Sequence, residues 1–401
     1  MTFNPHFAGL QQYPFERLRA LLDGVTPPAH LAHISLSLGE PKHEPPPFVI
    51  EALSNPDALR QHLATYPATR GSDELRAAIA AWLGQRFDVQ VSPDTQILPV
   101  NGTREALFSF AQAMLSGAPE SKVLMPNPFY QIYEGAALLA GATPYFINNE
   151  RGLGYQQDYR TVGADVWRHT ELVYLCSPGN PTGHIMTIAQ QQELIELAHQ
   201  HDFIIAADEC YSELYFDDEA APCSLLQASD LASNADFDRC VVFHSLSKRS
   251  NLPGLRSGFV AGSAKLLAEY FQYRTYHGCA LSAHHQQASA LAWADERHVV
   301  ENRALYREKF DAVSAILAPH YTLTQPDGGF YHWLPTPIND GEFARQLLGQ
   351  QNVTVMPGSF LARDTAAGNP GTNHVRLAWV ATFDECVEAA ERLAAFAQHL
   401  A

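Results

Sequence analysis

The chain has 401 residues, of which 46% are hydrophobic, so it can bury a sizeable core in one large and one smaller domain. Its formal net charge of −17 argues against nucleic acid as a partner, because binding to a phosphate backbone needs a basic surface. No stretch approaches the roughly 20 consecutive apolar residues of a membrane span, and no secretory signal pattern opens the chain. We therefore expect a cytoplasmic protein with no membrane partner.

The six cysteines are scattered, with no CxxC pair and no Cys/His cluster at zinc spacing. We interpret them as buried small hydrophobic residues in a reducing compartment and expect no metal site.

Short apolar strands alternate with helical patterns through the middle of the chain. We expect strands at 122–125, 171–176, 203–207 and 241–243, and a helix at 187–201. Strand, helix, strand at this spacing predicts βαβ units and a mostly parallel sheet, which is an α/β fold. Polar residues follow the C-terminal ends of these strands, where ligands bind in open sheets of this kind.

The pattern changes from about residue 302 onward. A long helix, a strand at 329–333 and a final helix from residue 383 predict a smaller α+β domain, and we expect the N-terminal residues to pack with it. The predicted division is an N-terminal segment at 1–45, a large domain at 46–290 and a small C-terminal domain at 291–401.

The strongest local signal is Lys248, which has serines three and one residues before it and an arginine eight residues after it. A lone lysine after a strand is usually a solvated charge. An amine that forms a Schiff base needs an adjacent phosphate site to hold the aldehyde. Ser245, Ser247 and Arg256 can supply that site, Arg256 through its bidentate fork.

A second signal is Asp208, at the end of the strand at 203–207. A carboxylate after so apolar a strand needs a partner, because desolvation of the charge is costly. The pyridinium nitrogen of pyridoxal phosphate (PLP) is a suitable partner, and capping of a following helix is the alternative.

Two loops add weaker signals. The segment 177–183, SPGNPTG, is a turn by composition, but Asn180 lies at a strand end, where it and Tyr211 can donate to a phenolate-like ring oxygen. Gly102 and Thr103 open an apolar helix, whose N-terminal N–H groups favour a phosphate.

Together these motifs closely resemble the fold-type I PLP enzymes, the class I/II aminotransferases. The resemblance covers nearly the whole chain in the right order, and its most specific part is NPTG at 180–183, Asp208, and Ser-x-Ser-Lys with Arg256 eight residues on. It implies a large PLP-binding domain with a mostly parallel, seven-stranded type of sheet flanked by helices, plus a smaller α+β domain built from both termini.

The resemblance also implies residue roles, with PLP as the cofactor and Lys248, Asp208 and Tyr211 as catalytic residues. Lys248 would carry PLP covalently and move the proton, and Asp208 would pair with the pyridine nitrogen. The implied cofactor-binding set is Gly102, Thr103, Arg104, Tyr130, Asn180, Asp208, Tyr211, Ser245, Ser247, Lys248, Arg256 and Tyr66. In it, Tyr130 would stack on the ring, and Tyr66 would reach the phosphate of the neighbouring subunit of a homodimer.

Within this family the chain resembles the bacterial N-succinyldiaminopimelate aminotransferases in the segments 13–19 and 36–43. That resemblance implies transfer of the amino group of N-succinyl-LL-2,6-diaminopimelate to 2-oxoglutarate in lysine biosynthesis, giving N-succinyl-2-amino-6-oxopimelate and glutamate. Arg376 would clamp the substrate α-carboxylate. The implied substrate-binding set is Gly39, Asn180, Arg376, Arg17 and Lys42. For Arg17 and Lys42, which would hold the distal carboxylates, solvated surface charge is the alternative.

Other reactions of the same fold stay open. An aspartate, aromatic or acetylornithine aminotransferase, or a β-lyase acting on cysteine conjugates, would keep Lys248, Asp208 and Arg376. A PLP-binding regulator would carry an added helix-turn-helix segment, for which the 45 residues before the large domain are too short.

Overall fold

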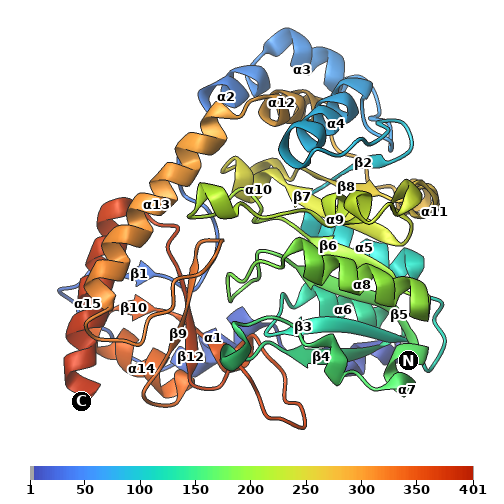
Figure 1. Cartoon of the computed structure of the whole chain (residues 1–401). Coiled ribbons are helices and arrows are strands. Elements are labelled where there is room, and N and C mark those ends of the chain that lie inside the picture. Colours follow the sequence, from blue (N-terminus) through green and yellow to red (C-terminus); the bar gives the residue numbers. More distant parts are fainter. Residues whose placement is uncertain (1–3, 401) are drawn as a thin grey trace.

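The computed structural model describes residues 4–400 and is built around a mixed seven-stranded sheet (Figure 1). The strand order is β2-β8-β7-β6-β5-β3-β4; neighbours from β7 to β4 are parallel, and β8 is antiparallel to both β2 and β7. The strands are β2 Ile97–Val100, β3 Lys122–Asn127, β4 Thr143–Asn148, β5 Thr170–Cys176, β6 Ile204–Asp208, β7 Cys240–Ser245 and β8 Gly258–Gly262.

Helices cover both faces of this sheet, and this is why its central strands read as continuous apolar runs. Alternate strand residues face opposite layers: Ile205 and Ala207 belong to one hydrophobic cluster, and Ala206 belongs to another. The first cluster includes α2 Pro47–Leu53, α4 Asp73–Phe87, α8 Ile188–His201, α9 Leu225–Leu231 and α12 Ala283–Ala294. The second includes α5 Thr103–Met114, α6 Ile132–Leu139 and α11 Ala264–His277.

The four predicted strands and the helix at 187–201 are confirmed. Thr187 is the N-cap of α8 and forms a capping box with Gln190. Two predicted ends are wrong by two residues: β3 continues through Pro126 to Asn127, where it pairs with β4, and β7 continues through His244 to Ser245, where it pairs with β8.

A third hydrophobic cluster lies beside a smaller sheet of three antiparallel strands in the order β11-β12-β9. Its strands are β9 Tyr331–Pro335, β11 Met356–Pro357 and β12 His374–Ala378. Its helices are α13 Arg297–Leu317, α14 Asp340–Gln351 and α15 Phe383–Leu400. α13 begins at Arg297, before the change of pattern at about residue 302, and in its first turn the His298 N–H donates a 3.0 Å hydrogen bond to the Asp295 carboxylate. The strand expected at 329–333 lies two residues later, after Gly329, whose φ is +86°.

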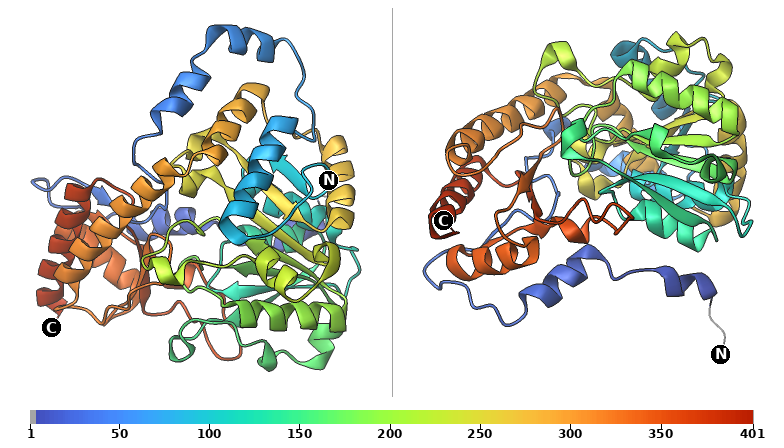
Figure 2. Two further views of the ribbon diagram at one scale, coloured as in Figure 1. Left: turned by 45° about the horizontal axis from the view of Figure 1, so that its top comes forward. Right: turned by 60° about the horizontal axis from the view of Figure 1, so that its bottom comes forward.

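The N-terminal segment joins both parts. β1 Ile34–Ser35 pairs in parallel with β10 Val353–Thr354, and α1 Pro14–Leu22 contacts α14, while residues 5–9 contact α6 of the large sheet (Figure 2). The remaining short helices are α3 Pro56–Leu63, α7 Ala164–Arg168 and α10 Leu246–Arg249. The division of the chain at residues 45 and 290 stays a prediction.

Within residues 4–400, the helices all lack the combined length and apolar character that crossing a membrane requires.

Candidate active site

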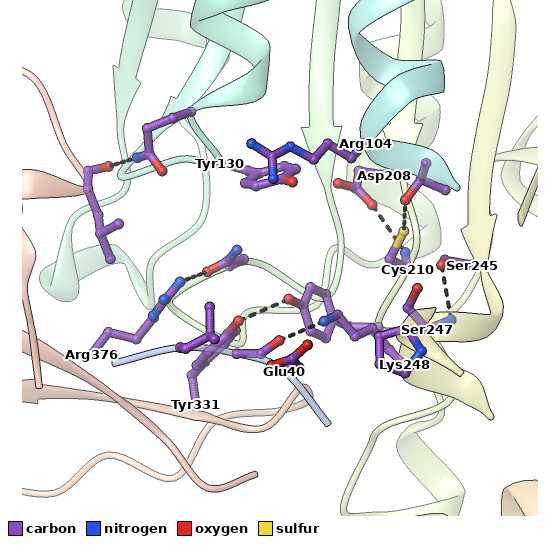
Figure 3. Close-up of a pocket in the computed structure, with 18 of the residues that line it drawn as sticks. Glu40, Arg104, Tyr130, Asp208, Cys210, Ser245, Ser247, Lys248, Tyr331 and Arg376 are labelled. Atoms are coloured by element: carbon purple, nitrogen blue, oxygen red, sulfur yellow. Dashed lines mark hydrogen bonds between the residues drawn. The ribbon is translucent and has the colours of Figure 1, made fainter. Parts of the chain in front are cut away.

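A cavity of about 390 Å³ opens at the C-terminal ends of β5, β6 and β7, where the two sheets face each other (Figure 3). It gathers residues that lie far apart in the sequence. Twelve of the predicted site residues line it: Gly39, Thr103, Arg104, Tyr130, Asn180, Asp208, Tyr211, Ser245, Ser247, Lys248, Arg256 and Arg376.

Lys248 reaches the cavity from α10, the short helix that follows β7 directly. Ser245 is the N-cap of this helix, and its hydroxyl accepts a hydrogen bond of 3.1 Å from the Ser247 N–H. The Lys248 amine donates to the Gly39 carbonyl at 2.7 Å. Removal from solvent is the main reason that the pKa of Lys248 falls to about 8. A primary amine with such a pKa is partly neutral near pH 7 to 8, as a nucleophile requires.

Asp208 is the last residue of β6 and is 4% exposed. Its carboxylate accepts hydrogen bonds from the Tyr133 hydroxyl at 2.6 Å and from the Cys210 N–H at 3.3 Å. Both donors are uncharged, and burial raises the pKa of Asp208. Residues 210–213 form turns and no helix begins before Asp218, so the alternative role as a helix cap is wrong. A protonated ring nitrogen in the cavity would supply the cation that this buried carboxylate lacks in its immediate hydrogen-bond partners.

Gly102 and Arg256 meet at the edge of the cavity in a way that suits a phosphate. Gly102 precedes α5 with φ +83°, and a Cβ at this position would lie 2.2 Å from Nη2 of Arg256. The absence of a side chain therefore lets the guanidinium approach the first turn of α5. Thr103 at that turn and the hydroxyls of Ser245 and Ser247 line the same cavity. A guanidinium, hydroxyls and a helix N-terminus are a donor set for a phosphate dianion.

Arg376 projects from β12 and binds to two other segments. It donates to Asn180 Oδ1 at 3.0 Å and to the Ser37 carbonyl at 2.8 Å, and it lies over the Tyr331 ring at 4.5 Å. Its buried Nε has no hydrogen-bond partner among residues 4–400. The side chain is thus fixed in the cavity wall by two hydrogen bonds, and a guanidinium in this position suits a carboxylate ligand.

Tyrosine side chains complete the wall. The hydroxyl of Tyr211 is 3.1 Å from that of Tyr331, and burial raises the pKa of Tyr211 well above its usual range. Tyr130 lies edge-on to Tyr133, with ring centroids 5.8 Å apart, and exposes its own ring to the cavity.

Four predicted residues are not among those that line the cavity: Gly102, which lies at its edge beside Arg256, and three that lie away from it. Tyr66 is fully exposed to solvent in the single chain. Arg17 lies 4.1 Å over the Phe360 ring, because its face of α1 packs there. Lys42 is exposed and lies near Glu385 of α15. The structure therefore brings neither Arg17 nor Lys42 into the cavity.

Sequence reasoning missed several residues that line or support the site, among them Tyr13, Glu40, Tyr133, Cys210 and Tyr331. A buried tyrosine hydroxyl needs a hydrogen-bond partner, which is a signal, but the sequence does not say which partner it finds.

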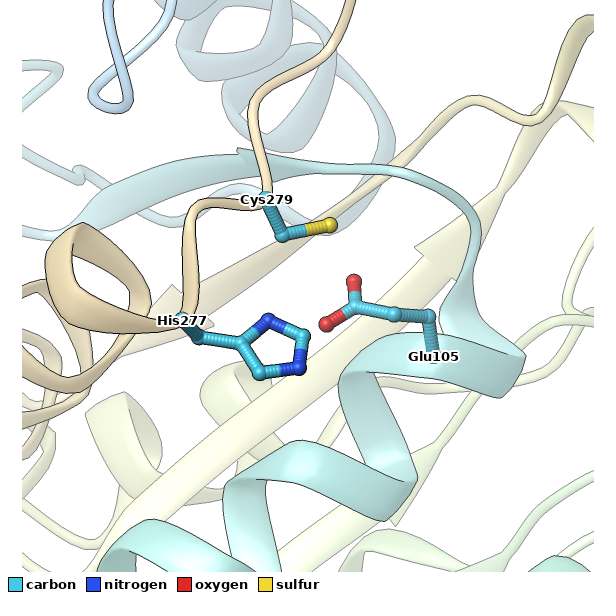
Figure 4. A group of neighbouring side chains, drawn as sticks. All are labelled: Glu105, His277 and Cys279. Atoms are coloured by element: carbon cyan, nitrogen blue, oxygen red, sulfur yellow. The ribbon is translucent and has the colours of Figure 1, made fainter.

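One group of side chains outside the cavity has the composition of a metal site. Ligand atoms of Glu105, His277 and Cys279 lie within 4.8 Å of one another (Figure 4). However, Nη1 of buried Arg274 donates to both carboxylate oxygens of Glu105 at 2.8 Å. Because this guanidinium already neutralises the carboxylate and would repel a cation, we interpret the group as a structural ion pair.

Comparisons with known proteins show the family of the chain. The family model of aminotransferase class I and II matches residues 32–393. An LL-diaminopimelate aminotransferase of Nitratidesulfovibrio vulgaris is 30% identical over 366 residues, which is 90% of each chain. An aminotransferase structure from Neisseria meningitidis has a TM-score of 0.94 and 45% identity, and the match covers 98% of this chain and all of the other. A Thermus thermophilus structure, described as a probable N-succinyldiaminopimelate aminotransferase, has a TM-score of 0.82 and 26% identity over 95% of this chain and 99% of its own.

The members of the matched family use PLP, and the cavity holds a lysine, a buried carboxylate and a phosphate-type donor set in one place. Sequence, fold and site thus agree, and the chain belongs to the class I and II aminotransferase family.

Proposed function

We propose that this aminotransferase binds PLP in the cavity and there transfers an amino group from an amino-acid substrate to a 2-oxo acid. The single observation that carries the proposal is the convergence of Lys248, Asp208, Arg256 and Arg376 on one cavity from four separate elements. Each supplies a different requirement: an amine, a counter-charge for a ring nitrogen, a phosphate ligand and a carboxylate ligand.

The roles follow from the positions of these groups. PLP, when bound, supplies a ring that accepts the electron pair released at the substrate α-carbon. Arg376 holds the substrate α-carboxylate, and Asn180 supports the guanidinium through their 3.0 Å hydrogen bond. Lys248 Nζ takes and returns the proton at the α-carbon, for which a pKa of about 8 is well matched near neutral pH. Asp208 keeps a ring nitrogen protonated through its negative charge.

For the substrate we propose N-succinyl-LL-2,6-diaminopimelate, with 2-oxoglutarate as the amino acceptor and glutamate as a product, in lysine biosynthesis. The resemblance in segments 13–19 and 36–43 and the described substrate of the Thermus thermophilus structure support this choice. Arg104 in the cavity wall adds a cation for a distal carboxylate.

Unacylated LL-diaminopimelate is the second candidate. Several relatives that are about 30% identical are described as LL-diaminopimelate aminotransferases. Glu40 also lines the cavity, and its carboxylate suits the free distal ammonium group that succinylation would remove.

We further propose a homodimer in which Tyr66 contributes to the neighbouring site. In support of this, Tyr66 is fully exposed and does not line the cavity of its own chain.

The experiment that tests the proposal has two parts. Borohydride reduction of the purified yellow protein, followed by peptide mass spectrometry, should find the cofactor on Lys248. Glutamate formation from 2-oxoglutarate is then compared for N-succinyl-LL-diaminopimelate, LL-diaminopimelate, aspartate, phenylalanine and acetylornithine. Turnover without any 2-oxo acid would instead indicate a β-lyase, and preference for aspartate or phenylalanine would exclude the diaminopimelate assignment.

A further inference from the structure

Tyr133 forms a short contact with the buried carboxylate of the site. Its hydroxyl donates to Asp208 Oδ2 at 2.6 Å, and the two side chains are 0% and 4% exposed. Tyr133 lies in the first turn of α6, on the layer of helices that covers the sheet behind the cavity. It does not line the cavity, so its hydroxyl acts on a bound ligand through Asp208 rather than by direct contact.

The position of the Tyr133 hydroxyl is fixed by aromatic packing. The Tyr133 ring stacks on Tyr174 of β5, with centroids 4.6 Å apart and planes 14° apart, and Tyr130 meets its edge. Tyr174 is itself anchored, because its hydroxyl donates to the Leu107 carbonyl at 2.6 Å. A ring held on two sides cannot swing its hydroxyl away from Asp208 without breaking this packing.

The Tyr133 hydroxyl is a donor that keeps its proton. Burial raises the pKa of Tyr133 well above the usual tyrosine range. On the other carboxylate oxygen, Oδ1, the Cys210 N–H donates at 3.3 Å. Hydrogen bonds to an ionised carboxylate favour that form, and thus oppose the desolvation that raises the pKa of Asp208.

We propose that Tyr133 is a positioning residue that holds the Asp208 carboxylate, by the hydrogen bond to Oδ2, in the orientation and charge state in which it binds a protonated ring nitrogen. This inference rests on the proposed function, since it assumes a pyridine ring in the cavity. It extends that function, because a residue that does not contact the ligand would then influence the protonation of the ring nitrogen.

The test compares two conservative variants. Tyr133→Phe keeps the aromatic stack and removes only the donor to Asp208. The matched control Tyr174→Phe removes the hydroxyl of the other ring in the same stack, whose acceptor is the Leu107 carbonyl. Apoenzymes are titrated with PLP and with a PLP analogue that has carbon in place of the ring nitrogen, and dissociation constants are read from tryptophan fluorescence.

We expect Tyr133→Phe to weaken PLP binding about tenfold, the loss typical of one hydrogen bond to a charged group. Binding of the analogue should change less than about twofold, because it offers Asp208 no ring N–H. Tyr174→Phe should leave the preference for PLP over the analogue unchanged. In the Asp208→Asn background, removal of the Tyr133 hydroxyl should have no further effect on that preference, since the charge it supports is absent.

Equal losses for PLP and the analogue would show a merely structural role and overturn the inference, as would wild-type PLP affinity in Tyr133→Phe. If Tyr133→Phe does not fold, Tyr133→His keeps an N–H donor: retained preference for PLP supports the inference, and loss of preference overturns it. Failure of the wild-type apoenzyme to bind PLP would instead overturn the proposed function.

Discussion

The amine of Lys248 donates a 2.7 Å hydrogen bond to the carbonyl of Gly39, which lies 209 residues earlier in the chain. The contact joins α10 of the large sheet to the N-terminal segment, just after the point where Leu36 binds β12 through the Ala378 N–H. The segment that carries Gly39 and Glu40 therefore closes the cavity on the lysine side. Lys248 must leave this carbonyl before its amine can attack a ligand.

Covalent attachment of PLP to Lys248 should depend on pH in a defined range. The pKa of about 8 lies below the ordinary lysine value, so the neutral amine becomes the major form above pH 8. When PLP is mixed with apoenzyme, the attachment rate should rise between pH 7 and 9 and then level off. The attachment rate is measured from the growth of the visible absorbance band of the bound cofactor.

Lys248→Ala should show no attachment at any pH, and Lys265→Ala, which changes an exposed lysine, should behave as wild type. A rate that still climbs steeply at pH 10 would mean that the Lys248 amine is not desolvated.

Substitution of Gly102 should weaken the phosphate site specifically. In Gly102→Ala the new Cβ would lie 2.2 Å from Arg256 Nη2, so the guanidinium must move away from the first turn of α5. We expect at least about tenfold weaker PLP binding, the effect of one lost charged hydrogen bond. Binding of pyridoxal, which lacks the phosphate, should change far less.

Gly117→Ala is the control for alanine at a positive φ. Gly117 has a similarly positive φ of +72°, but a Cβ there meets nothing within 4 Å. Both variants place alanine at a positive φ, but Gly102 also has ψ 151°, a combination that residues other than glycine rarely adopt. The comparison of PLP with pyridoxal within Gly102→Ala therefore reports on the phosphate site, because backbone strain affects both ligands. Equal losses for PLP and pyridoxal would contradict the phosphate assignment.

Arg104 should determine selectivity for substrates with a distal carboxylate. It lines the cavity, and its guanidinium carbon lies 5.5 Å from the centre of the Tyr13 ring. Arg104→Gln should raise KM for N-succinyl-LL-diaminopimelate about tenfold, with little change for phenylalanine. The double variant Arg17→Gln/Lys42→Gln is the comparison, and we expect it to change neither KM appreciably, because neither side chain lines the cavity. The reverse ranking of the two variants would restore the original assignment of Arg17 and Lys42.

The assembly should be a dimer that needs Tyr66. Light scattering should give about twice the 44.3 kDa mass of the chain. Tyr66→Phe should remain dimeric and bind PLP more weakly, since a hydroxyl that reaches the neighbouring phosphate is lost. A fully active monomer in solution would be incompatible with a shared site.

The sequence by itself determined four of the parallel strands, the helix between two of them and the three residues with the most specific spacing. Strands such as 203–207 and the helix at 187–201 could be predicted because periodicity and capping depend on neighbours in the chain. Lys248, Asp208 and Arg256 could be found because each follows the end of a strand, or lies in the loop after one, where an α/β sheet binds ligands.

Only the tertiary structure decided which distant side chains meet. The Arg376 hydrogen bond to Asn180 spans 196 residues, and the Tyr133 bond to Asp208 spans 75. From the sequence, Tyr133 is indistinguishable from a core residue. Arg17 and Lys42, which lie close to Gly39 in the sequence, were predicted to bind substrate. Their roles depend on the direction in which α1 and the chain after Pro41 pack, toward Phe360 and α15, and such packing is set by contacts between remote segments rather than by local pattern.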